Sequence, residues 1–146
     1  MNRLINGSAL CAYLRPIIHN YKEHKENFLK TMSIEAFRSE FGTIELALPR
    51  RSGKTYAIDR LANEFENSLI VVSSTYNIPN YNYKRVVSIG QIPKMEVPFD
   101  KPDIFGDYIF VDEFTYIPKE QLDNLREQVC DEPMFIMLGT KRWYYS

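Results

Sequence analysis

The chain has 146 residues, which is enough for one domain with a single hydrophobic core. Hydrophobic residues make up 45% of it and charged residues 25%, as in an ordinary globular protein, and no apolar run approaches the roughly 20 residues that cross a bilayer. The formal net charge of −1 provides no overall field that would attract nucleic acid or a membrane surface.

The N-terminal part of the chain is expected to be helical. Apolar residues recur there at helical spacing: Leu10, Tyr13, Leu14, Ile17, Ile18 and Tyr21. Pro16 should start, kink or split this helix, Ser33 should cap a second one, and Gly42 should end it. Because the pattern changes at that point, we divide the chain into a helical segment, residues 1–42, packed on a core formed by residues 43–146.

Short apolar runs alternate with amphipathic segments over the rest of the chain. The runs that predict strands are residues 43–48, 69–72, 86–89, 108–111 and 135–138. Helices are expected after Gly53, completing a right-handed βαβ unit, and after Pro118, whereas residues 75–84 are rich in tyrosine and asparagine and resemble a loop. This alternation predicts an α/β fold with an open, mostly parallel sheet and helices on its faces.

The strongest chemical signal is the segment Ser52–Thr55, between an expected strand and an expected helix. Gly53 would let the backbone approach phosphates, Lys54 would neutralise the β/γ oxygens, and the Thr55 hydroxyl would complete a magnesium shell at the helix N-terminus. The usual phosphate loop has a first glycine where this chain has Leu48. Taken alone, the segment fits an ordinary helix start with an exposed lysine equally well.

Two carboxylates follow the apolar run that ends at Val111. In an open α/β sheet the carboxyl ends of the strands point at the ligand crevice. Asp112 would then hold magnesium through water, and Glu113 would orient and polarise an attacking water. A lone Asp–Glu pair is usually a solvated strand end, but together with the loop it predicts nucleotide binding, with Thr55 and Asp112 as metal ligands.

Further residues extend the predicted site. Thr140 ends the last strand, where its hydroxyl could report the γ-phosphate, although turn chemistry would also favour Gly139–Thr140. Arg50 and Arg51 suit the charge of a transferring phosphoryl group, and plain surface arginines are the alternative. The predicted catalytic residues are Glu113, Arg50 and Lys54, with Arg50 acting in its own chain. The predicted nucleotide-binding residues are Arg51, Ser52, Gly53, Lys54, Thr55 and Thr140.

The loop Leu48–Thr55 resembles the altered Walker A loop of viral large terminase ATPases, the motors that package DNA into capsids. That family often lacks the first glycine and carries an arginine in the loop. The segment Phe110–Phe114, followed by Ile117–Pro118, is similar to its Walker B segment, and Gly139–Thr140 falls where its coupling motif follows the next strand. The resemblance covers residues 43–142.

This resemblance implies a minimal three-layer P-loop NTPase of the glutamate-bearing (ASCE) branch, which hydrolyses ATP with Mg²⁺ and drives or switches viral DNA packaging. Its candidate partners are ATP, double-stranded DNA, other viral packaging proteins and further copies of the chain, with no membrane. The length leaves room for the ATPase core but not for the nuclease domain of that family. Two distant cysteines and no signal peptide suggest a cytoplasmic protein, in the host cytoplasm if it is viral.

Two other functions stay open at this point. One is a nucleotide-binding interaction module with little turnover, and the other is a small-molecule kinase, which would seldom carry a glutamate at the position of Glu113. The terminase family usually has an upstream glutamine that reads adenine, but the first glutamine here is Gln91. The adenine contact is therefore unassigned, with Tyr13, Arg15 and Phe37 as candidates.

Overall fold

The structure is a computed structural model that describes residues 6–33, 35–37, 42–94, 105–129 and 133–141. Its strands are β1 (Thr43–Leu48), β2 (Ser68–Val72), β3 (Val86–Ser88), β4 (Tyr108–Asp112) and β5 (Met134–Thr140). They form a five-stranded sheet in the order β1-β5-β4-β2-β3, and every neighbouring pair in it is parallel. The predicted α/β class and parallel sheet are therefore confirmed.

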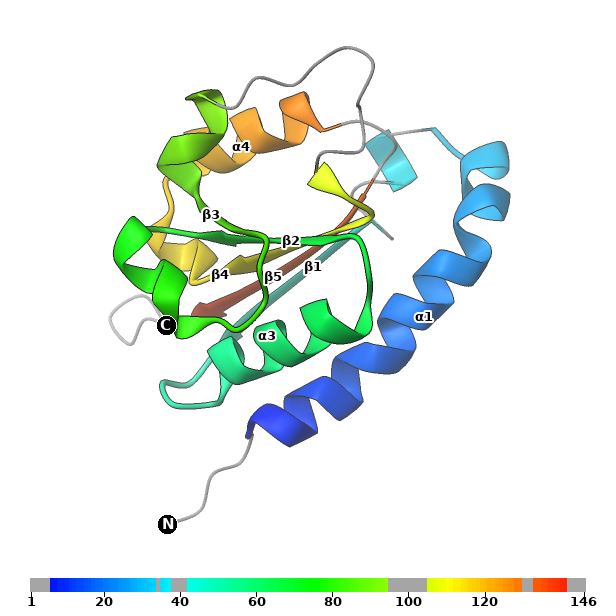
Figure 1. The fold of residues 1–146 in the computed structure, drawn as a ribbon. Helices are drawn as coiled ribbons and strands as arrows, with labels where there is room; N and C mark the ends of the chain where they lie inside the picture. Colours follow the sequence, from blue (N-terminus) through cyan, green and yellow to red (C-terminus); the bar gives the residue numbers. More distant parts are fainter. Residues whose placement is uncertain (1–5, 34, 38–41, 95–104, 130–132, 142–146) are drawn as a thin grey trace.

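Helices cover both faces of this sheet (Figure 1). The α-helices are α1 (Gly7–Thr31), α3 (Lys54–Glu64) and α4 (Lys119–Gln128). Short 3₁₀ helices are η1 (Thr75–Asn80), η2 (Ile89–Lys94) and η4 (Phe114–Tyr116). Helices α1 and α3 lie side by side on one face and α4 lies on the other. No helix among the described residues is long and apolar enough to cross a membrane.

Alternate residues of the central strands enter two separate hydrophobic clusters. In β4, Phe110 packs with α1 and α3, whereas Ile109 and Val111 pack with Leu125 of α4. All five residues of β2 and all five of β4 are buried. Strands covered on both faces are apolar throughout, and this explains why these runs lack the alternation of a half-exposed strand.

The order of the strands determines where the loops meet. Strand β5 lies between β1 and β4, with Leu48 of β1 opposite Thr140 and Asp112 of β4 opposite Leu138. Because the strands are parallel, their carboxyl ends share one edge of the sheet. The loop after β1, the end of β5 and the acidic pair after β4 are therefore neighbours. Strands β1 and β2, expected as one βαβ unit, are parallel but not adjacent.

Two local expectations differ from the structure. Helix α1 neither starts nor splits at Pro16, which lies on the exposed face of the helix, opposite its buried residues. The buried face can therefore continue through the proline. The loop expected over residues 75–84 contains η1, whose first turn is capped by the Ser74 hydroxyl accepting from the Tyr76 amide. Ser33 does cap the turn at residues 35–37, and residues 38–41 lie outside the described residues.

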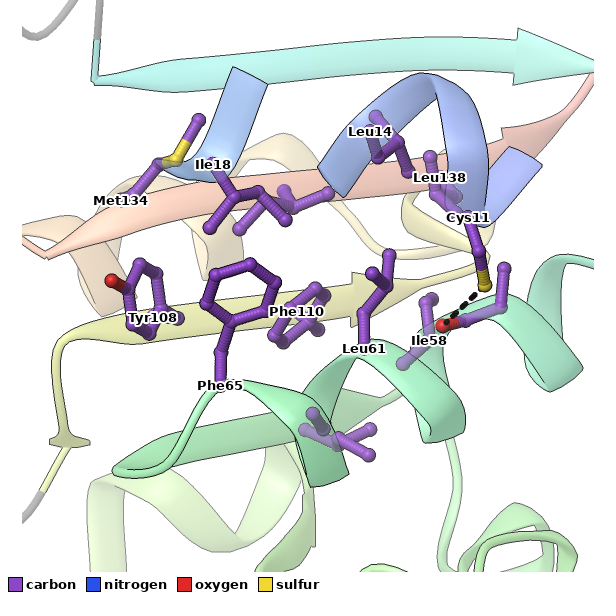
Figure 2. Close-up of a cluster of buried hydrophobic side chains, with 14 of the residues drawn as sticks. Cys11, Leu14, Ile18, Ile58, Leu61, Phe65, Tyr108, Phe110, Met134 and Leu138 are labelled. Atoms are coloured by element: carbon purple, nitrogen blue, oxygen red, sulfur yellow. Dashed lines mark hydrogen bonds between the residues drawn. The ribbon is translucent and has the colours of Figure 1, made fainter. Parts of the chain in front are cut away.

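Helix α1 contributes to the main core. Figure 2 shows Leu14 and Ile18 of α1 against Met134 and Leu138 of β5. Cys11 lies in the same row, and its thiol donates to the Ala57 carbonyl at 3.7 Å. Burial raises the pKa of this thiol. The second cysteine, Cys130, lies outside the described residues.

Replacing Leu14 by alanine should lower the free energy of unfolding by about 2–5 kcal/mol, because it leaves a cavity between α1 and the sheet. Leu14 is 0% exposed, whereas its neighbour Tyr13 is 58% exposed. Tyr13→Ala on the same helix is therefore the matched control and should change stability by less than about 0.5 kcal/mol. Urea unfolding measures both variants. Equal midpoints would show that α1 does not belong to the core.

Candidate functional site

The loop between β1 and α3 is a tight turn with left-handed backbone at Arg51 (φ 60°) and Gly53 (φ 81°). Gly53 is also crowded, because a Cβ at this position would lie 2.4 Å from the backbone nitrogen of Gly7. The start of α1 therefore packs directly on the loop, and only glycine suits both the backbone angle and the contact. Helix α3 begins at the next residue, Lys54.

Two polar side chains of this loop are buried. Ser52 is 3% exposed and Lys54 is 7% exposed. The Ser52 hydroxyl has no hydrogen-bonding partner within the described part of the chain. A buried polar group without a partner is costly, so a water molecule or a ligand oxygen that paired with this hydroxyl would lower that cost. Arg50 and Arg51 are exposed.

Asp112, at the end of β4, is the most buried carboxylate of the site. It is 4% exposed. Its Oδ2 accepts a hydrogen bond from the Thr55 hydroxyl at 2.8 Å and another from the Tyr81 hydroxyl. Its Oδ1 is buried and has no partner among the described residues. Burial raises the pKa of Asp112 above its usual range, although the hydrogen bonds from Tyr81 and Thr55 act in the opposite direction.

Glu113 faces a different neighbour because its own backbone is left-handed, with φ 55° and ψ 46°. Its two carboxylate oxygens accept from the Thr140 hydroxyl at 2.9 and 3.0 Å, and Oε1 lies 3.4 Å from the Lys54 ammonium. Such backbone costs a non-glycine residue about 1–2 kcal/mol and is concentrated at functional sites. The turn after Glu113, which contains η4, lies close to β5 at Gly139. A Cβ added to Gly139 would lie 2.8 Å from the Thr115 side chain.

A small cavity of about 70 Å³ opens beside the acidic pair. It is lined by Thr55, Val72, Asn77, Asn80, Tyr81, Asp112 and Glu113. This volume suits an ion with a few water molecules. A whole nucleotide would extend outside it.

The residues present fit a magnesium ion that shares its shell with phosphates. In the part of the chain that the structure describes, no three His, Cys, Asp or Glu side chains come together as a protein-only metal cage. Mg²⁺ usually keeps several waters and takes only one or two protein oxygens beside substrate phosphates. Thr55 and the unpartnered oxygen of Asp112 supply that number.

The structure brings together most of the predicted site residues. Contacts connect Thr55 to Asp112 and both Lys54 and Thr140 to Glu113, while Ser52 is buried in the loop before them. Arg50 and Arg51 are exposed, and no hydrogen bond or ion pair within the described part of the chain connects them to this group.

The sequence reasoning missed the residues after β2. Tyr81, Asn77 and Asn80 line the cavity. The sequence signal for these residues is the cluster of tyrosine and asparagine that follows a buried strand, but such a composition alone predicts only a loop. Because β2 is the parallel neighbour of β4, the segment after β2 lies next to the acidic pair.

Of the adenine candidates, two are excluded. Phe37 is 0% exposed and belongs to the core. Arg15 forms a hydrogen-bonded ion pair with Glu64 at the last residue of α3, the opposite end of that helix from Lys54. Tyr13 remains exposed on α1.

Gly53→Ala should destabilise the protein by at least about 1–2 kcal/mol, from left-handed strain alone. The clash with Gly7 should add to this loss. Gly90→Ala is the control, since nothing lies within 4 Å of a Cβ there, and it should not destabilise the protein but raise its stability by about 0.4–1 kcal/mol. Urea unfolding of the two variants checks this, and equal stability would contradict the packing of α1 on the loop.

A scan of the sequence against models of known protein families finds no match, and a search of curated proteins finds no relative. The main features of the site are a buried lysine and hydroxyls at the start of α3 and two carboxylates at the end of β4 that meet them.

Proposed function

We propose that this chain is a magnesium-dependent ATPase with a P-loop NTPase fold of the glutamate-bearing branch. The observation that carries the proposal is the meeting of the two sequence motifs, through two side-chain pairs, at the carboxyl edge of the sheet. Thr55 contacts Asp112, and its neighbour Lys54 contacts Glu113. Consecutive residues of the loop motif therefore each meet one carboxylate of the acidic motif, although 57 residues separate Thr55 from Asp112.

The loop would bind the phosphates. Lys54 carries a positive charge on a buried side chain, and the Ser52 hydroxyl lacks a partner. Phosphate oxygens would satisfy both groups, and the amides and dipole at the start of α3 add to the attraction. The strand order is consistent with the assignment, because only β5 lies between the strand before the loop, β1, and the strand that ends in Asp112, β4.

Thr55 and Asp112 would hold the magnesium. The Thr55 hydroxyl donates a hydrogen bond to Asp112, so the lone pairs of the Thr55 oxygen remain for a metal. The bound ion would offset negative charge on the β and γ phosphates.

Glu113 would act on the water that attacks the γ-phosphate. Its carboxylate is held by Thr140 and paired with Lys54, and its side chain is 29% exposed. When Lys54 turns to phosphate oxygens, Glu113 loses that partner and its oxygen becomes available to accept a proton from water. Thr140, the last residue of β5, would keep the Glu113 carboxylate oriented. In this way it would couple the end of β5 to the γ-phosphate.

Arg50 would stabilise the transferring phosphoryl group from within the same chain, because it lies on the phosphate loop and is exposed. The resemblance of residues 43–142 to terminase ATPases supports a role in driving or switching viral DNA packaging. DNA, packaging proteins and further copies of the chain are the partners that this role implies.

One observation favours the second candidate, a nucleotide-binding module with little turnover. Both oxygens of Glu113 are already occupied by Thr140, and one also by Lys54. A chain in which this arrangement persisted with nucleotide bound would hold ATP without preparing water. Measured turnover separates the two functions.

Lys54→Ala should weaken magnesium–ATP binding by about 10- to 100-fold, because a hydrogen bond to a charged group is worth about 1.5–3 kcal/mol. Calorimetry with purified protein measures the affinity. Lys119→Ala, an exposed lysine at the start of α4, is the control and should bind normally. Equal affinity in wild type and Lys54→Ala would remove the phosphate-loop assignment.

Glu113→Gln should retain ATP but hydrolyse it ~10²–10⁴-fold more slowly, because the amide keeps the shape of the side chain and cannot accept a proton. Phosphate release under saturating ATP measures the rate. Glu120→Gln, an exposed glutamate on α4, should behave as wild type. An unchanged rate in Glu113→Gln would mean that another residue prepares the water, and no turnover in wild type would favour the binding module.

A further inference from the structure

Tyr81 is a buried tyrosine whose hydroxyl has not yet been given a role. It follows η1, and its ring packs in the main core beside α3 and the sheet. Its hydroxyl donates to Oδ2 of Asp112, and the residue lines the cavity beside the acidic pair.

The segment that carries Tyr81 is anchored outside the site. The Asp59 carboxylate, on α3, accepts from the amides of Asn82 and Tyr83, both at 2.9 Å. The Tyr83 hydroxyl donates to the Ser68 carbonyl at 2.8 Å and accepts from the Ser68 amide at 3.1 Å, which ties the segment to the start of β2. These bonds hold the chain directly after Tyr81 without using Asp112.

Asp112 is consequently bound in an asymmetric way. Its Oδ2 receives two donors from different elements, Thr55 on α3 and Tyr81 after η1. Its Oδ1 receives none and is buried. Two donors on one oxygen leave the carboxylate little freedom to rotate, so the other oxygen stays the one available to a ligand.

We propose that Tyr81 is a positioning residue of the magnesium site, where its hydroxyl fixes the Asp112 carboxylate so that one oxygen stays free for the metal's water shell. This inference rests on the proposed function, because it concerns the same metal. Partners that hydrogen-bond a metal-binding carboxylate typically change metal affinity by about 10- to 100-fold when they are removed. Tyr81 would therefore affect the metal without touching the phosphates.

The test compares Tyr81→Phe with Tyr83→Phe. Both variants keep the aromatic ring and delete one hydrogen-bonded hydroxyl from the same segment. Only the Tyr81 hydroxyl bonds to Asp112, because that of Tyr83 bonds to Ser68. ADP affinity is measured by calorimetry in EDTA and again in saturating Mg²⁺, and the ratio of the two affinities gives the contribution of the metal. Sucrose in all samples stabilises the folded state if either variant is weakened.

We expect the metal contribution to fall about 10-fold or more in Tyr81→Phe and to stay at the wild-type value in Tyr83→Phe. In EDTA all three proteins should bind ADP equally, which a general loss of structure would not allow. In an Asp112→Asn background, Tyr81→Phe should cause no further loss, because the residue would act only through Asp112.

The results that would overturn the inference alone differ from those that would overturn the proposed function. If wild type gains affinity from Mg²⁺ and Tyr81→Phe gains as much, the inference is wrong while the proposed function stands. A loss of the same size in Tyr83→Phe, or a loss in EDTA, would show that the hydroxyl is structural and would also overturn the inference. If wild type binds no ADP, or gains nothing from Mg²⁺, the proposed function fails and the inference fails with it.

Discussion

The position of β5 between β1 and β4 is the constraint on which the candidate site depends. Parallel pairing places Leu48 opposite Thr140 and Asp112 opposite Leu138, so three carboxyl ends lie along one short stretch of the sheet edge. The backbone amide of Lys141 also donates to the Leu48 carbonyl at 2.7 Å, which continues the pairing into the first residue of the loop. A slip of one residue in this register would turn Thr140 to the opposite face and remove the partner of Glu113.

The site is locally unfavourable and is supported by the packing around it. Ser52, Lys54, Asp112 and Thr140 are all buried polar residues, and Glu113 has left-handed backbone. Backbone strain of this kind costs about 1–3 kcal/mol per residue, and an unpaired buried polar atom a similar amount. Two hydrophobic clusters, one on each face of the sheet, supply the opposing stabilisation. The polar groups are gathered at the carboxyl edge of the sheet, at the border of the two clusters, and this permits their burial without breaking the core.

Local patterns predicted the elements well, whereas contacts between distant segments could not be predicted. The strand at residues 43–48 agrees with β1 at both ends, because an apolar run bounded by Gly42 and the turn-rich loop has little freedom. The sheet order was not predictable, since sequence spacing does not reveal that β5 lies beside β1. Tyr81 was missed for the same reason: its role depends on β2 pairing with β4. Continuation of α1 through Pro16 depends on which face of the helix is buried, which becomes known only from the packing.

Asp112 and Glu113 are consecutive in the chain, yet their surroundings differ, and the tasks proposed for them rest on this difference. Asp112 ends a strand, is almost fully buried, and meets two neutral hydroxyl donors. The left-handed turn at Glu113 directs the next carboxylate towards β5 instead, where it is partly exposed and meets the Lys54 ammonium. A carboxylate held rigidly by neutral donors suits a metal shell, because an ion supplies the missing positive charge. A carboxylate whose charged partner could turn to a phosphate suits the proposed proton transfer from water, since it would become a free base only with substrate bound.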